Sequence, residues 1–304
     1  MSRFIVAVAA AITLSACSGG NPFAGGEDPE NPIEPDPTIP TDIAGDVDSI
    51  TYDAVNQTLV VRGQTLDDTP YEATYRRRPA LDRPGYEAYS SQESSLGRHH
   101  TAYARERDGA SAGIVMAGGQ FGHVFLGGYY ERDGAFDAPP TAAPGGIVQY
   151  AGRYVGLLNG PGDGGDLLPV TPGTDPEVLP TQAAEVVGNI FIAADFVDNT
   201  TDGIVYDRVA PDYPTLVLAD LELAPAGIDS TAGTFDGPVE QDNGNRTVGD
   251  WGGIFAGDDS SAIAGALYVE DHIEDVDGER EIGLFVLAQC GTPNADPICN
   301  QPNP

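Results

Sequence analysis

The run "GDWGGIFAGDDSSAIAGALYVE", residues 249–270, decides the fold of this chain. It consists of two apolar segments around a polar turn, which predicts a β-hairpin. Both predicted strands contain glycines, which normally weaken a strand. In the first strand aromatic residues and glycines alternate on one face, and "YAGRYVG", residues 150–156, repeats the pattern. The aromatic residues on these two faces are Trp251, Phe255, Tyr150 and Tyr154.

A small closed barrel explains glycines at these positions. Its strands must coil sharply, and glycine allows that bend while leaving room for a neighbouring aromatic ring to lie across the backbone. We therefore expect Trp251, Phe255, Tyr150 and Tyr154 to fill the interior of a barrel or to plug one of its ends. The alternative for Trp251, the only tryptophan, is an exposed aromatic platform for a ligand.

Eight strand candidates follow one another between residues 144 and 291. They are "IVQYAGRYVGLL", "AEVVGNIFIAADF", "TDGIVYDRV", "TLVLADLELA", "AGTFDGPVEQ", "GDWGGIFAG", "SAIAGALYVED" and "REIGLFVLAQC". Most connections are short, which favours hairpin pairing, and the exception is the Gly- and Pro-rich stretch at 159–182. We predict an all-β protein with a C-terminal eight-stranded up-and-down antiparallel β-barrel, because closure removes exposed sheet edges.

Residues 46–143 form an earlier unit with a different charge balance. Short runs rich in Tyr, Val and Thr predict a small antiparallel β domain, which ends near the linker-like "DAPPTAAPGG" at 137–146. This unit holds 14 acids and 9 arginines, a net charge of −5, whereas residues 144–291 hold 26 acids and 4 arginines, a net charge of −22. The asymmetry predicts two separately built units.

The first residues carry an export signal. Arg3 precedes the apolar run "FIVAVAAAITL", which is too short to span a bilayer, and "LSAC" ends the segment at Cys17. This pattern resembles a bacterial lipoprotein signal, which implies removal of residues 1–16, lipid on Cys17 and anchoring to a membrane outside the cytoplasm. Ser18, where an aspartate would favour the inner membrane, favours the outer membrane. The alternative is an ordinary secretory signal and a soluble exported protein.

Two further segments flank the predicted domains. Residues 17–45 are rich in Gly, Pro and acids and predict a disordered, extended tether. Cys290 and Cys299 are the two cysteines left in an exported chain, and we expect them to form a disulfide that closes a small C-terminal loop. Residues 292–304 are expected to be a tail.

Five pieces of the predicted barrel occur in a recognisable order. They are "YAGRYVGLLN", "GNIFIAADFVDNTTDGIV", "GTFDGPV", "GDWGGIFAGDDSSAIAGAL" and "EIGLFVL". This set, over about residues 146–288, resembles the C-terminal barrel of transferrin-binding protein B-like surface lipoproteins. The resemblance implies a β handle domain before the barrel, a lipid anchor and export by a surface lipoprotein assembly modulator. Full transferrin-binding proteins have two such lobes and this chain has room for one, so transferrin itself is not carried over.

The sequence predicts a protein without enzymatic activity. The four histidines, His99, His100, His123 and His272, lie in no nucleophile or zinc pattern. We interpret "RHH" at 98–100 as a solvated polar turn, with a metal site as the alternative. "IDSTAG" at 228–233 resembles an aspartic-protease motif only imperfectly and is interpreted as a turn.

The charged residues limit the partners. The net charge of −33 disfavours nucleic acid and anionic surfaces. We expect no cofactor, with Ca²⁺ as the alternative, because carboxylates on mobile loops suit that ion. The acids of the two candidate loops are Asp271, Glu274, Asp275, Asp277 and Glu279 at a predicted hairpin tip, and Asp163 and Asp166 in "GPGDGGD". The spacing is not that of an EF-hand, so solvated acidic loops are favoured.

The arginines of "YRRRPALDRPGY" are a local exception in an acidic chain. They are Arg76, Arg77, Arg78 and Arg83. Guanidinium groups can bind an anionic partner or ligand through carboxylate or phosphate, or can pair with the protein's own acids. We favour internal pairing and keep the ligand site as the alternative.

The function we expect is that of a lipid-anchored outer-membrane or cell-surface binding protein, which captures a solute or protein partner without catalysis. The protein would face either the cell surface or the periplasm. The alternative is a structural or adhesive surface lipoprotein with no small-molecule ligand.

Overall fold

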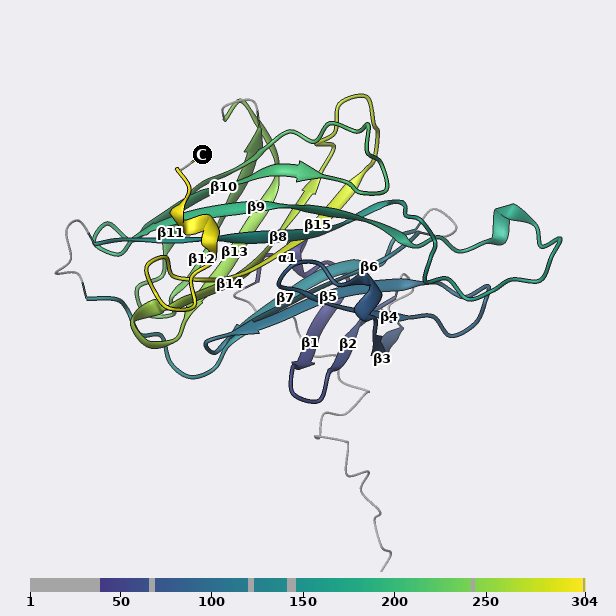
Figure 1. Cartoon of the computed structure of the whole chain (residues 1–304), viewed down its shortest axis with the longest axis horizontal. Coiled ribbons are helices and arrows are strands. Elements are labelled where there is room, and N and C mark those ends of the chain that lie inside the picture. The colour runs from purple at the N-terminus through teal and green to yellow at the C-terminus, as the bar shows by residue number, and fades with distance from the viewer. Residues whose placement is uncertain (1–38, 66–68, 120–122, 141–145, 242–243, 303) are drawn as a thin grey trace, which may run out of the picture. The chain divides into compact units, whose positions relative to one another are not determined.

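Two antiparallel β-sheets make up the described part of the chain, and one of them closes into a barrel (Figure 1). The structure, a computed structural model, describes residues 39–304 apart from 66–68, 120–122, 141–145, 242–243 and 303. The expected signal peptide, the lipidation site Cys17 and most of the expected tether therefore lie outside the described residues. Among the residues it does describe, no helix is both long and apolar enough to cross a membrane.

The first sheet has seven strands in sequence order. They are β1 (Val47–Asp53), β2 (Thr58–Gln64), β3 (Pro70–Arg77), β4 (Glu87–Ser91), β5 (His100–Arg107), β6 (Ala110–Ala117) and β7 (Leu126–Arg132). The sheet curls until the residue before β1 reaches the start of β7. The Asp46 amide donates to the Leu126 carbonyl at 2.8 Å, and the Leu126 amide donates to the Asp46 carboxylate at 3.0 Å. One face of the sheet thereby encloses a small core of its own, which includes Tyr75, Tyr89 and Val115.

The second sheet is an eight-stranded barrel whose strands also follow the sequence order. They are β8 (Ile147–Pro161), β9 (Ala183–Asp195), β10 (Thr200–Val209), β11 (Leu221–Ile228), β12 (Thr234–Gln241), β13 (Arg246–Ala256), β14 (Ala262–Glu270) and β15 (Arg280–Ala288). β15 pairs with β8, with Glu281 opposite Leu158, and so closes the barrel. The predicted all-β class and the predicted up-and-down barrel are confirmed.

Short helical segments connect or precede the strands in the described residues. They are α1 (Thr41–Ala44) and the 3-10 turns η1 (Pro79–Leu81), η2 (Pro176–Val178), η3 (Asp258–Ser260) and η4 (Pro297–Asn300).

Aromatic side chains pack the interior of the barrel. The four that the sequence analysis expected there are each at most 1% exposed and belong to one core cluster: Tyr150, Tyr154, Trp251 and Phe255. Trp251 packs against Phe235 with ring centroids 5.0 Å apart, and its indole N–H donates to the Ala224 carbonyl at 3.2 Å. Trp251 is therefore an interior residue with its polar atom satisfied, and it is not exposed as a platform for a ligand.

Glycines in the strands leave the space that these rings occupy. A Cβ at Gly265 would lie 2.4 Å from the ring of Phe285 and 2.2 Å from the Gly252 carbonyl oxygen. A Cβ at Gly253 would lie 2.5 Å from the ring of Phe235. The aromatic rings lie directly over the backbone of the neighbouring strand, so a side chain at either position would overlap a ring.

The outer face of β13 and β14 carries small residues for a second reason, because the first sheet packs on it. The β14 residues in this contact are Ala262, Ala264 and Ala266. They share a core cluster with Ile114 and Met116 of β6. On β13, a Cβ at Gly252 would lie 2.8 Å from the hydroxyl of Tyr130 on β7. The run at 249–270 thus uses glycine and alanine on both faces, inside for the aromatic core and outside for close sheet packing.

The expected tether ends earlier than predicted. Residues 39–45 are part of the folded structure, with Ile39 6% and Ile43 0% exposed, and α1 contacts β7, β13 and β14. Ile43 lies in α1 and Ile39 precedes it, separated by the extended residue Pro40, and both side chains belong to one core cluster. The average composition of 17–45 concealed these two core residues, and the prediction of a tether as far as Gly45 is wrong.

One barrel strand is shifted relative to its prediction. The sequence predicts this strand over 215–224, whereas β11 covers Leu221–Ile228 and so includes Pro225, which lacks a backbone N–H. In the structure the pairing of β11 with β12 shifts register between Leu223 and Gly227, so the proline occupies an irregularity where a ladder donor is not required.

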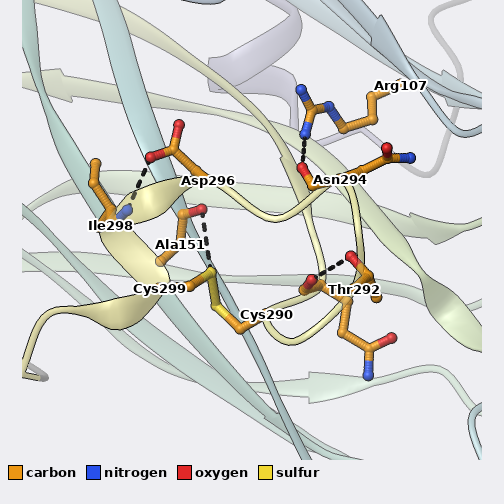
Figure 2. Close-up of a disulfide and its surroundings, with 9 residues drawn as sticks. Arg107, Ala151, Cys290, Thr292, Asn294, Asp296, Ile298 and Cys299 are labelled. Atoms are coloured by element: carbon orange, nitrogen blue, oxygen red, sulfur yellow. Dashed lines mark hydrogen bonds between the residues drawn. A yellow bond between two sulfur atoms is a disulfide. The ribbon is translucent and has the colours of Figure 1, made fainter.

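The C-terminal residues are fastened to the barrel by a disulfide between Cys290 and Cys299 (Figure 2). The Cys290 amide donates to the Gln149 carbonyl of β8 at 2.7 Å, and Cys299 Sγ lies 4.0 Å from the Ala151 carbonyl oxygen. The turn η4, which includes Cys299, packs on β8, with Ile298 only 4% exposed. The start of the expected tail at 292–304 is thus held against the barrel by a buried isoleucine and by the disulfide that the sequence predicts.

We predict that Gly265→Ala destabilises the protein, because the new methyl group would overlap the Gly252 carbonyl oxygen and the Phe285 ring. The expected loss is about 1–3 kcal/mol in the free energy of unfolding, measured by urea denaturation. Gly227→Ala in β11 is the matched control, since no heavy atom lies within 4 Å of its added Cβ. Equal destabilisation by the two substitutions would contradict the packing argument.

We also predict that the double replacement Cys290→Ser and Cys299→Ser lowers the free energy of unfolding by about 2–4 kcal/mol, because the disulfide restricts the unfolded chain. Urea denaturation of the oxidised wild type and of the double variant measures the difference. A reducing agent should weaken the wild type alone; an equal effect on the variant would show that the agent acts elsewhere.

Candidate functional site

The arginine-rich turn after β3 pairs with the protein's own carboxylates. Arg77 forms a bidentate pair with Asp82, with N–O distances of 2.5 and 2.7 Å. Arg78 Nε lies 3.0 Å from Asp166 Oδ1, in the long connection between β8 and β9. Arg76 pairs with Ser90 through the strand backbone, but its exposed side chain has no hydrogen bond or ion pair with any residue the structure describes. Internal pairing, which we favoured from the sequence, is thus observed for Arg77, Arg78 and Arg83. These three arginines are not free to bind a ligand.

Arg83, the fourth arginine of the cluster, connects the first sheet to the barrel. It pairs with Glu185 of β9, whose side chain is only 4% exposed. Glu185 Oε1 also accepts a hydrogen bond of 2.6 Å from the hydroxyl of Tyr103 on β5. Burial raises the pKa of Tyr103. The carboxylate therefore receives donors from the sheet while its backbone belongs to the barrel, and it fixes one against the other.

The two adjacent histidines are buried, which corrects the interpretation of 98–100 as a solvated turn. His99 is 1% exposed, and its Nε2 lies 2.9 Å from Asp166 Oδ2. His100 packs between Tyr71 and Phe125, with ring centroids 5.5 Å away in each case. Burial, with a smaller contribution from Arg98, lowers the pKa of His100 to about 4. The turn residues were expected to meet water, but β4 and the long barrel connection cover them.

Ser90, His99 and Asp166 come together without forming a catalytic triad. The Ser90 hydroxyl donates to Asp166 Oδ2 at 2.5 Å, the same oxygen that His99 Nε2 contacts. In a triad the histidine stands between the hydroxyl and the carboxylate and removes the hydroxyl proton. Here the carboxylate is central, and Arg78 Nε donates to Ser90 Oγ at 2.8 Å. This geometry stabilises the contact between sheet and barrel and does not activate a nucleophile.

A buried polar network lies inside one end of the barrel and was not predicted. Arg208 donates to Glu281 Oε2 at 2.6 Å and to the Ala219 carbonyl at 2.6 Å. The Tyr154 hydroxyl donates to Glu281 Oε1 at 2.5 Å, and His272 Nε2 lies 3.2 Å from Glu281 Oε2. The side chains of Arg208, Glu281 and His272 are fully buried. Glu281 thus sits among donors from three different strands and loops.

The network controls the protonation of Glu281. Burial by itself would raise its pKa, but Arg208, His272 and Tyr154 together hold the pKa at about 2, below its ordinary value of 4.5. The sequence contained a signal for this network. Glu281 alternates with Gly283 and Phe285 in "EIGLF", so it shares the interior face, and a charge on that face requires a buried partner.

A cleft opens at the same end of the barrel. Its volume is about 540 Å³. Its lining residues come from the end of β8, from the connection between β10 and β11 and from the loop between β14 and β15: Leu158, Asn159, Gly160, Pro161, Tyr213, Thr215, Leu216, Ile273, Val276, Asp277, Gly278 and Glu279. Tyr213 is held by its hydroxyl, which donates to the Pro161 carbonyl at 2.6 Å. The cleft has an apolar wall and a buried carboxylate, that of Glu279.

The acidic loop between β14 and β15 uses two of its carboxylates in its own structure. Asp271 Oδ1 accepts from the Gly278 amide at 3.1 Å, and Glu279 Oε1 accepts from the Ile273 amide at 2.6 Å. The other three acids of this loop are exposed: Glu274, Asp275 and Asp277. In the part of the chain that the structure describes, no three His, Cys, Asp or Glu side chains form a group that could hold a metal ion. The geometry adds no support for Ca²⁺ here.

Comparison with known proteins identifies no family. No protein-family model matches the sequence, and no curated protein matches it. Among solved structures, the chain is similar to a double mutant of Transferrin Binding Protein B from Haemophilus parasuis Hp5, with a TM-score of 0.40, 11% identity and coverage of 76% of this chain and 51% of that chain. It is also similar to intact Ap-TbpB, with a TM-score of 0.38, 11% identity and coverage of 76% and 52%.

A third similar structure is close to this chain in length. It is described as a surface lipoprotein, and the match has a TM-score of 0.36, 13% identity and coverage of 80% of this chain and 97% of that chain. The chain spans about half the length of the Transferrin Binding Protein B structures, 51% and 52%. Likeness at this level assigns neither a family nor a partner.

We predict that acid weakens the barrel through Glu281. Its folded pKa of about 2 lies below its ordinary value of 4.5, so the stabilisation is present above about pH 4.5 and is lost as the pH falls toward 2. The expected loss over this interval is about 3 kcal/mol in the free energy of unfolding. Urea denaturation at a series of pH values measures it.

Glu281→Gln supplies the control for this pH dependence. The substitution leaves Arg208 buried without a charged partner, so we expect destabilisation of about 3–5 kcal/mol at neutral pH and a flatter dependence below pH 4.5. An unchanged slope in the variant would assign the acid sensitivity to other carboxylates.

Proposed function

We propose that the chain is a lipid-anchored binding protein of the outer membrane, which captures a solute or protein partner without catalysis. The observation that carries the proposal is the filled interior of the barrel, in which Tyr150, Tyr154, Trp251 and Phe255 are each at most 1% exposed. A barrel with a packed interior is a scaffold rather than a container. Recognition is therefore left to its loops, and binding sites on rigid scaffolds are commonly built from loops.

The lipid anchor and the location rest on the sequence. The segment ending in "LSAC" at Cys17 resembles a lipoprotein signal, and the barrel pieces resemble those of transferrin-binding protein B-like surface lipoproteins. Two folded units behind an N-terminal anchor suit a protein that presents its loops away from the membrane. We extend the proposal to surface display and to passage through a surface lipoprotein export machinery.

A structural or adhesive role without a small ligand is the second candidate. The observation in its favour is that Arg77, Arg78 and Arg83, three of the four arginines of the alternative ligand site, pair with the protein's own acids. The cleft at the barrel end favours the binding role over this one.

We predict that Cys17→Ser abolishes labelling of the protein by radioactive palmitate and releases it from the membrane fraction, because the substitution removes the lipid attachment site. Cys299→Ser is the matched control, since Cys299 belongs to the C-terminal disulfide and its loss should leave labelling unchanged. Membrane retention of Cys17→Ser would contradict lipid anchoring.

Protease treatment of intact and lysed cells tests the surface display. An antibody to the barrel should lose its signal in intact cells that carry the wild-type protein. Full protection in intact cells, with digestion after lysis, would refute surface display and place the barrel in the periplasm.

A further inference from the structure

We propose that the cleft at the end of the barrel binds a small organic cation, a ligand with a primary ammonium group on an apolar body. This inference rests on the proposed binding function and specifies its ligand class. It is carried by one carboxylate and the walls around it, which lie on the end of β8 and on the loops that follow β10 and β14.

Glu279 supplies the polar contact. It lines the cleft and its side chain is only 4% exposed. One carboxylate oxygen, Oε1, accepts from the Ile273 amide at 2.6 Å, and His272 Nδ1 lies 3.7 Å from this same oxygen. The other oxygen, Oε2, is buried and has no hydrogen-bond partner among the described residues. A buried carboxylate oxygen without a donor is costly, and an ammonium group offers the donor and the charge that it lacks.

Among the described residues no arginine pairs with Glu279, and its basic neighbour is His272, whose Nδ1 lies 3.7 Å from Oε1 and not against the unpaired Oε2. Arg208 is the buried arginine of this barrel end, and it is engaged by Glu281 and by the Ala219 carbonyl. The residues that line the cleft include no arginine and include a second acid, Asp277. The cleft is therefore negative in a chain whose net charge of −33 attracts cations from solution.

Apolar side chains form the rest of the cleft and suit the body of such a ligand. They are Leu158, Tyr213, Leu216, Ile273 and Val276. Tyr213 and Leu216 pack against the core cluster of the barrel, so the wall is anchored to the interior. The volume of about 540 Å³ lies within the range of about 300–1,000 Å³ typical of small-molecule sites.

The loop that carries Glu279 is fastened to β8 before any ligand arrives. The Asn159 side-chain amide donates to the Gly278 carbonyl at 3.0 Å, and the Arg280 amide donates to Asn159 Oδ1 at 3.0 Å. A preformed site loses less conformational entropy on binding. An anion would face Glu279 and Asp277, and a neutral apolar molecule would leave Oε2 unpaired, so the geometry selects a cation.

The test compares three probes of the same shape on the purified full-length protein in detergent micelles, with detergent blanks. They are 2-phenylethylamine, 2-phenylethanol and 3-phenylpropionate, and calorimetry with saturation-transfer NMR measures binding. We expect the amine to bind and the alcohol and the carboxylate to bind at least about tenfold more weakly, because neither meets the carboxylate with a charged donor.

Glu279→Gln should reduce the affinity for the amine at least about tenfold while conserving the shape of the side chain. Asp202→Asn, which removes an exposed carboxylate of β10 outside the cleft, should leave the affinity unchanged. If Glu279→Gln fails to fold, Val276→Arg introduces a cation at a position that is 41% exposed and should likewise abolish amine binding.

Equal affinity for the amine and the alcohol, or amine affinity that survives both Glu279→Gln and Val276→Arg, would overturn the proposal. The proposed function is judged separately, because palmitate labelling and protease accessibility do not involve the cleft. Loss of the cation site with intact anchoring and display would leave a surface binding protein whose ligand is of another class.

Discussion

Close approach between the first sheet and the outer wall of the barrel is the constraint on which the rest of the structure depends. Alanines 262, 264 and 266 of β14 and Gly252 of β13 keep that wall nearly smooth. Larger residues from β6 and β7, among them Met116 and Tyr130, fill the space they leave. The inner face of β13 also carries Trp251 and Phe255. The hairpin of β13 and β14 therefore contributes side chains to two hydrophobic cores. The barrel and the sheet consequently share apolar surface as well as polar contacts.

In this chain with few basic residues, the buried Arg208 and the partly buried Arg78 and Arg83 each have a carboxylate partner. The chain has 14 arginines and 47 acids. Arg78, Arg83 and Arg208 each hold a carboxylate that would be costly to bury alone. Two of these pairs join the sheet to the barrel or to its long connection, and the third lies inside the barrel. Most of the remaining acids lie on the surface and in the loops.

The sequence was informative where the determining pattern is local. Alternation of aromatic residues with glycine predicts the interior positions of Trp251 and Tyr150, since parity along one strand decides the face. The order of the barrel strands follows from short connections. The continuation of β11 past Pro225 is not a local property, because the tolerance of a proline depends on the pairing of both neighbouring strands.

Contacts between distant residues could not be predicted in the same way. Glu281 meets Arg208 and Tyr154 only because the barrel closes, and these residues are 73 and 127 positions apart in the sequence. His99 is buried by Asp166, which comes from a connection that the composition describes only as rich in glycine and proline. The cleft forms where three separate segments meet at one end of the barrel. The sequence therefore identified Glu279 as an acid of a predicted hairpin tip, but not as a residue that lines a cleft.

The closure of the barrel by β15 has a consequence for folding. β15 completes the ring against β8, and it also brings Glu281, the residue that Arg208 requires. Until Ala288 is available, strands β8–β14 have two open edges and an arginine without its counterion. Long-range pairing of this kind forms late, because the loop-closure entropy must be overcome before the contacts are gained. Without β15 the other seven strands of the barrel form an open sheet with two unpaired edges, so the loss of this one strand removes the closed ring.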